Sequence, residues 1–259
     1  MYQFQDPNGR ITTDAIIAPS DNLTVNGQRL DAVVPGYRHL YVDGRGLIAQ
    51  ENDSDKVPGR AGVALKGRQY ASRKITVYYQ IRVGSSRELR DSYAALNKAL
   101  AGNLTLSFAD EPLWEYEAIL ADVSEGPEQS LDVKGHFTLL CPSPWKYLQK
   151  QTSSNGQIRL SHASEVTPLK LSVITSKVSD RVEIINRGQR IVLGGSFASG
   201  QLVTVEYKPD EISITYGGRS ILHQLQRFSD LENFTLRDGD TVTAVNATIQ
   251  TIEWRDKRL

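Results

Sequence analysis

The sequence predicts a mainly β protein of two domains, and three observations support this prediction. Apolar and polar residues alternate along most of the chain, which is typical of strands with one buried face. Only one segment has helical spacing. A proline-rich and then polar stretch from Pro142 to Gln157 interrupts the alternation near the middle of the 259 residues, a length that suits two ordinary domains. We therefore expect domains at residues 1–147 and 148–259.

The first domain is expected to combine a β-sheet or barrel with one packed helix, an α+β arrangement. Alternating apolar residues predict strands around residues 75–83, 104–108 and 114–120. From about residue 86 to 101 the apolar residues instead recur every three or four positions, which would place them on one stripe of a helix. Ser85 and Glu88 fit a capping box at its start, and Gly102 fits its end. The apolar stripe consists of Leu89, Tyr93, Leu96 and Leu100.

Between about residues 34 and 62 the pattern becomes irregular. This stretch contains Pro35-Gly36, Asp43-Gly44-Arg45-Gly46, a polar run from Gln50 to Lys56, and Pro58-Gly59. So long a segment with little apolar periodicity is uncommon inside a compact domain. We expect a long arm that is mobile or reaches away from the domain.

The second domain is expected to contain strands only. Turn residues separate the segments, for example at Asn186-Arg187-Gly188 and Gly217-Gly218. Many short strands at such spacing favour a β-sandwich or jelly roll. The expected strands are residues 169–174, 181–186, 189–193, 202–207, 211–216 and 241–254.

Composition excludes several classes of function. Lys and Arg together number 30, as do Asp and Glu, so the chain lacks the positive charge of a typical nucleic-acid-binding protein. No apolar run reaches the length that spans a bilayer, and the N-terminus does not resemble a secretory signal, so we expect synthesis in a cytoplasm and no membrane partner. The single cysteine, Cys141, lies at the end of an apolar strand and is expected to be buried and inert.

Two groups of residues suggest an enzyme, but neither is well placed for catalysis. Asp110, Glu111, Glu115 and Glu117 lie close to aromatic residues, as in a glycoside hydrolase cleft. Strand alternation, however, places Glu115 and Glu117 on the face opposite those aromatic residues. The glycine-rich stretch 194–200 lacks the lysine of a phosphate-binding loop and is expected to be a turn. We therefore expect no catalytic residues.

Two further groups of residues are candidates for binding sites. The four histidines, His39, His136, His162 and His223, have no metal-ligand spacing, so neither a metal nor another cofactor is expected. Aromatic residues of the second domain could stack on a sugar, although core packing is the usual role of aromatic residues in alternating strands. A carbohydrate-binding, lectin-like module remains the alternative function. The candidate platform residues are Tyr207, Tyr216 and Trp254.

An ordered series of short motifs carries a family resemblance. It comprises Asp43-Gly44-Arg45-Gly46, Gly67-Arg68-Gln69-Tyr70, Arg73 to Val77, Ser85 with Glu88-Leu89-Arg90, Leu96, Leu100, Leu104 to Phe108, Asp110-Glu111-Pro112, Tyr116 and Pro144-Trp145-Lys146-Tyr147. In this order the motifs resemble the N-terminal domain of the distal tail protein (Dit) family of long-tailed, siphovirus-type phages, mainly of Gram-positive hosts. The second half resembles the family only in kind, because members often carry a galectin-like β-sandwich there.

The resemblance implies a structural virion protein at the phage tail tip, made in the host bacterial cytoplasm. It implies a homohexameric ring hub that joins the major tail tube protein to the tail-associated tip protein and anchors receptor-binding or baseplate proteins. The family brings no catalytic residues, and DNA would pass through the ring channel without being recognised. The arm would then be a ring or partner contact, and its candidate residues are Arg38, Arg45, Gln50, Lys56 and Arg60.

Overall fold

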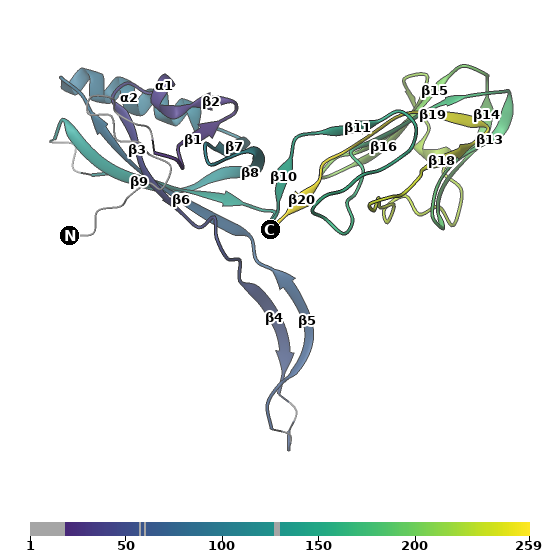
Figure 1. The fold of residues 1–259 in the computed structure, drawn as a ribbon, viewed down its shortest axis with the longest axis horizontal. Helices are drawn as coiled ribbons and strands as arrows, with labels where there is room; N and C mark the ends of the chain where they lie inside the picture. Colours follow the sequence, from purple (N-terminus) through teal and green to yellow (C-terminus); the bar gives the residue numbers. More distant parts are fainter. Residues whose placement is uncertain (1–18, 57, 60, 127–129) are drawn as a thin grey trace. The chain divides into compact units, whose positions relative to one another are not determined.

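The protein is mainly β, as the sequence predicts, and its contacts divide it into two compact units. The computed structural model describes residues 19–56, 58–59, 61–126 and 130–259. Unit 1 extends to Lys146, with Leu259 added, and unit 2 comprises Tyr147–Arg258 (Figure 1). Among the described residues, no helix is both long and apolar enough to cross a membrane.

Unit 1 is built on an antiparallel sheet whose strands follow the order β2-β1-β7-β8-β9-β6-β3. The buried positions of β6 alternate at Ile75, Val77, Tyr79 and Ile81, because successive side chains of a strand point to opposite faces. The strands are β1 (Leu23–Val25), β2 (Gln28–Arg29), β3 (Tyr37–Asp43), β6 (Arg73–Arg82), β7 (Leu104–Phe108), β8 (Glu111–Ser124) and β9 (Asp132–Cys141).

Helix α2 (Ser86–Ala99) covers one face of this sheet (Figure 1). Two hydrogen bonds cap its N-terminus. The Glu88 N–H donates to the Ser85 hydroxyl, and the Glu88 carboxylate accepts from the Gly84 N–H. The predicted apolar stripe, Leu89 to Leu100, lies in the same core as the buried residues of β6 and β9. The short helix α1 (Leu30–Val33) precedes β3, and Ser92 of α2 donates to the Pro35 carbonyl beside it.

The segment expected to be an irregular arm over residues 34–62 has a different extent and a regular structure. Its first third is not an arm, because β3 pairs with β6 inside the sheet and buries Tyr37 and His39. The projecting part is an antiparallel hairpin of β4 (Gln50–Asp55) and β5 (Ala64–Tyr70), which extends from the sheet in Figure 1. Neither strand has an apolar face, so the alternation that reveals other strands is missing here.

Unit 2 is a two-layer β structure with a core between its sheets. The larger sheet has the order β11-β19-β12-β15-β16-β17 and the smaller has the order β14-β13-β18. Buried residues of both sheets, such as Val173, Val203, Ile184 and Leu193, belong to one cluster, which is the packing of a β-sandwich. The strands are β11 (Gln151–Ser153), β12 (Lys170–Thr175), β13 (Ser179–Asn186), β14 (Gln189–Phe197), β15 (Leu202–Tyr207), β16 (Ile212–Tyr216), β17 (Arg219–Ser220), β18 (Thr243–Val245) and β19 (Ala247–Trp254).

Three smaller elements complete the chain. The 3-10 helix η1 (Leu222–Gln224) follows β17, and β10 (Lys146–Leu148) pairs with β20 (Lys257–Arg258). The glycine-rich stretch is not wholly a turn, because Gly194 and Gly195 lie within β14. A Cβ on either one would lie within 2.7 Å of the end of the Gln226 or Gln224 side chain, so these flexible glutamines would have to move to admit a larger residue.

Cys141, at the end of β9, is fully buried, and burial raises the pKa of its thiol to about 11. Because the thiolate is the reactive form, two factors slow its reaction in the native protein: exclusion from solvent and an unfavourable ionisation. We expect the native chain to react with a disulfide reagent at pH 8 about 100-fold or more slowly than the urea-unfolded chain. Equal rates in both states would show that this thiol is accessible.

Candidate assembly arm and its root

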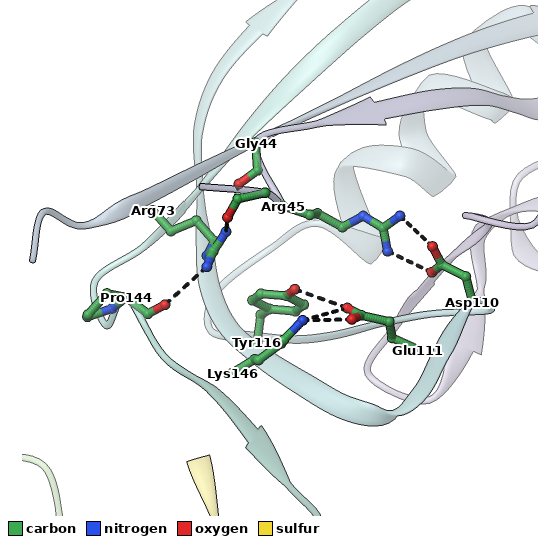
Figure 2. Close-up of polar contacts among 9 residues, drawn as sticks. Gly44, Arg45, Arg73, Asp110, Glu111, Tyr116, Pro144 and Lys146 are labelled. Atoms are coloured by element: carbon green, nitrogen blue, oxygen red, sulfur yellow. Dashed lines mark hydrogen bonds and ion pairs between the residues drawn. The ribbon is translucent and has the colours of Figure 1, made fainter. Parts of the chain in front are cut away.

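The strongest candidate site in unit 1 is the hairpin, which we call the arm (residues 47–70), together with the residues that hold its base, which we call the root. The root consists of Gly44, Arg45, Arg73, Asp110, Glu111, Tyr116, Pro144 and Lys146 (Figure 2). It joins the ends of β3 and β6, from which the arm departs, to the turn between β7 and β8 and to the segment that follows β9. Every described residue from 50 to 70 is exposed except the half-buried Ala64.

Arg73 anchors both sides of the root. Its side chain lies in the core wall at 3% exposure and donates to the carbonyls of Gly44, Gly46 and Pro144 at 3.0, 3.2 and 3.4 Å (Figure 2). The guanidinium also lies 5.6 Å from the centre of the Tyr116 ring. A planar group with five donors in a fixed fork can reach separate chain segments at once, whereas the three donors of a lysine all lie on one nitrogen. Arg73 therefore fixes where the arm begins.

Gly44 makes this close approach possible. Its φ is +92°, and a Cβ there would lie 2.0 Å from the Lys74 carbonyl oxygen. Only glycine combines the left-handed backbone with such proximity to the neighbouring strand. The chain can thus turn out of β3 directly beside β6 and enter the arm.

Arg45 binds the turn between β7 and β8. Its guanidinium donates to both carboxylate oxygens of Asp110 at 2.6 Å (Figure 2). It also lies 4.3 Å from the centre of the Phe108 ring. Partial burial alone would lower the pKa of Arg45, but the Asp110 carboxylate outweighs it and raises that pKa. The bidentate geometry and the aromatic contact are the features that make an arginine pair strong.

A second ion pair closes the root below Arg45. Lys146 Nζ lies 2.7 and 2.9 Å from the two carboxylate oxygens of Glu111, and the Tyr116 hydroxyl donates to the same carboxylate at 3.4 Å. Burial, and then the nearby Glu111 charge, raise the pKa of Tyr116 to about 12. The side chain of Lys146 is only 8% exposed, so removal of Glu111 would leave a buried ammonium group without its ion-pair partner.

Two contacts stabilise the part of the arm that lies next to the root. The Ala71 N–H donates to the Ala49 carbonyl at 3.1 Å, which closes the base of the hairpin. The ring of Tyr70 meets the ring of Trp145 edge-on with centres 5.8 Å apart. Beyond these contacts β4 and β5 pair with one another and with no other described strand.

The five predicted arm residues are not brought together. Arg38 lies exposed on β3, outside the arm, and Arg45 lies in the root. Gln50 begins β4 opposite Tyr70, and Lys56 follows β4 as an exposed side chain near the tip. Arg60 lies outside the described residues. The partners that form the root were not predicted as a site, because Arg45 and Asp110 are 65 positions apart and share no local pattern.

The carboxylates considered for glycoside hydrolysis form no catalytic pair. Asp110 and Glu111 are engaged with Arg45 and Lys146, whereas Glu117 is exposed on the face opposite the buried Trp114 and Tyr116. A hydrolytic pair needs two carboxyl groups flanking a substrate. Asp110 and Glu111 instead stabilise the fold of the root.

The candidate sugar platform is largely used in packing. Trp254 is 3% exposed, and the Tyr216 ring meets the Phe197 ring edge-on while its hydroxyl accepts from the Ala198 N–H at 2.7 Å. Burial raises the pKa of Tyr207. Trp254 therefore offers no open stacking face, whereas Tyr207 and Tyr216 are half-buried and only partly used in packing.

No group of His, Cys, Asp and Glu in the described part of the chain is arranged to hold a metal ion. Of the four histidines, His39 is buried with Nε2 3.3 Å from Asp21 Oδ1. Burial of Asp21 alone would raise its pKa, but the hydrogen bond and charge of His39 lower it. Asp21 also accepts from the Val42 N–H at 3.1 Å, so this pair secures β3.

Comparisons with known proteins match this fold. No protein-family model and no curated protein matches the sequence. Among solved structures, the chain is similar to the Dit protein of phage SPP1, a paradigm of the hub adsorption apparatus in phages that infect Gram-positive bacteria. The TM-score is 0.75 with 19% identity over 92% of this chain and 99% of that chain. It is also similar to a chain of the phage p2 baseplate, with a TM-score of 0.50 and 11% identity over 86% and 91% of the two chains. The chain therefore has the fold of a phage distal tail protein.

Proposed function

We propose that this chain is the hub of a phage tail tip and acts by assembly rather than by catalysis. Six copies form a ring through unit 1, and the ring joins the tail tube to the tip protein. Unit 2 faces outward as a galectin-like sandwich and carries receptor-binding or baseplate components. The protein is a virion component made in the bacterial cytoplasm. Support comes from the similarity to the SPP1 hub protein over nearly the whole length of both chains.

The observation that carries the proposal is the arm on its rigid root. Buried and charge-paired groups at Arg73, Arg45 and Lys146 fix the base, yet the strands beyond it bury none of their side chains. A two-stranded ribbon is marginal in water by itself. Such an arm is therefore suited to a surface outside its own chain, and a closed ring of identical copies supplies one at every position.

Excision of the arm tests its part in assembly. Residues 50–70 are replaced by a short Gly-Ser turn, which the close approach of Ala49 and Ala71 allows. We expect wild-type protein to have about six times the 28.8 kDa mass of one chain in native mass spectrometry, and the excised chain to have the mass of one. Circular dichroism should show that both units of the excised chain remain folded.

The outcomes separate the ring from the arm. A ring that survives the excision would contradict the role of the arm but leave the hub intact. A wild-type chain that stays monomeric, and does not bind tube or tip proteins encoded beside it, would contradict the hub itself. Hydrolysis of cell-wall polysaccharide that is lost in Glu117→Gln would instead support an enzyme.

A further inference from the structure

The charges of the arm are separated between its two strands. β4 carries Glu51, Asp53 and Asp55 and no basic residue, whereas β5 carries Lys66 and Arg68 and no acidic residue. Because the hairpin has only two strands, each strand is also an outer edge. One edge of the arm is therefore acidic and the other basic.

The pairing register divides these charges between the two faces only in part. The register shifts between Asp53 and Ser54 and leaves Lys66 without an opposite residue, and its Nζ reaches Asp55, which alternates onto the face of Glu51 and Asp53. Glu51 lies opposite Gln69 and Asp53 opposite Gly67, so the two carboxylates share one face. Arg68 lies opposite Asn52, which places the guanidinium on the other face. The clear separation is therefore between the edges: the acidic side of the arm is its β4 edge, with Glu51 and Asp53, and the basic side is its β5 edge, with Lys66 and Arg68.

Contacts within the arm neutralise few of these charges. Lys66 Nζ lies 2.5 Å from Asp55 Oδ2, but both side chains are more than half exposed, so this pair contributes little. Glu51 accepts a hydrogen bond from Gln69 at 3.0 Å. Within the described part of the chain, no ion pair joins Asp53 or Arg68 to a partner. The two sides remain available to another molecule.

We propose that the arms of neighbouring copies dock head to tail, the acidic side of one arm against the basic side of the next. A two-fold contact between strand edges would pair β4 with β4 or β5 with β5, acidic on acidic or basic on basic, which opposes association. A heterologous contact places acidic against basic at every junction and closes into a ring when the rotation allows. The occupant of the arm surface is therefore a second copy of this chain. This inference rests on the proposed ring and adds the rule by which its arms recognise one another.

Reciprocal charge reversal tests this rule. In E51K/D53K both sides of the arm become basic, and in K66E/R68E both become acidic. We expect each variant alone to need about tenfold or more higher concentration to assemble at low salt, because like charges meet at every junction. An equimolar mixture should regain the ring mass, because opposite charges meet again when the two variants alternate around the ring.

A matched control changes the same charge elsewhere. D210K/E232K alters two exposed carboxylates of unit 2 and should assemble like the wild type. The four arm positions are exposed, so the thermal midpoint of every variant should match that of the wild type in circular dichroism. The readouts are native mass spectrometry and sedimentation velocity at two salt concentrations, since added salt screens exposed charges.

Every outcome decides the question. Restoration of the ring in the mixture alone supports head-to-tail docking. Rings formed by either variant alone, or a mixture that fails as the single variants do, would overturn the docking rule while the wild-type ring still stands. A wild-type sample with the mass of one chain would overturn both the ring and this inference.

Discussion

Arg73→Met is expected to lower the free energy of unfolding of unit 1 by about 3 kcal/mol. The change removes donors to three carbonyls that lie on both sides of the root, and leaves them without a charged partner. Methionine fills a similar volume, so the loss reports the polar contacts rather than a cavity. Differential scanning calorimetry measures the effect as a lower transition temperature.

The arm provides a second readout of the same change. In the wild type the Ala71 N–H is hydrogen-bonded to Ala49, and we expect its hydrogen exchange to accelerate when Arg73 no longer holds the base. Arg82→Met, at the exposed end of the same strand, is the control and should leave stability nearly unchanged. Equal stability of the Arg73 and Arg82 variants would show that the root does not depend on Arg73.

Asp256→Ala is expected to lower the free energy of unfolding of unit 2 by about 4 kcal/mol. The carboxylate is fully buried and accepts from the backbone N–H groups of Ser161, His162, Ala163 and Lys257 at 2.7 to 3.0 Å. Alanine would leave these amides without their acceptor inside the protein. Urea unfolding measures the loss, and Asp210→Ala, at an exposed site, is the control.

Asparagine at position 256 refines this test. It keeps one acceptor oxygen but replaces the other with a donor that faces N–H groups, so we expect a loss smaller than that of alanine yet clearly measurable. If Asp256→Asn matched the wild type, the carboxylate would not organise this loop. Loss of unit 2 stability with an unchanged ring mass would also separate the two units functionally.

Local patterns predicted most of the fold. The capping residues of α2 and its apolar stripe are local, as is the alternation of Ile75 to Ile81, and burial of one face produces each pattern directly. The predicted limits of the arm, residues 34–62, were wrong because its segments lack a clear pattern of this kind. β3 was hidden by flanking Pro35-Gly36 and Asp43-Gly44, and β4 buries no face, so it has no apolar alternation.

The root could not be predicted from spacing. Arg73 contacts Pro144 across 71 positions, and Lys146 contacts Glu111 across 35, so only the folded chain brings them together. The charge separation of the arm, by contrast, can be seen in the amino-acid sequences of β4 and β5. Its structural meaning appears only once the pairing shows that β4 and β5 form a two-stranded hairpin, in which each strand is an edge.

Negative-stain imaging of the purified wild-type protein tests the central claim most directly. We expect class averages of a closed ring with a central opening and six repeated units, each copy contributing one arm to the next. Single particles of the size of one chain at high concentration, or pairs related by a two-fold axis, would contradict the proposed hub.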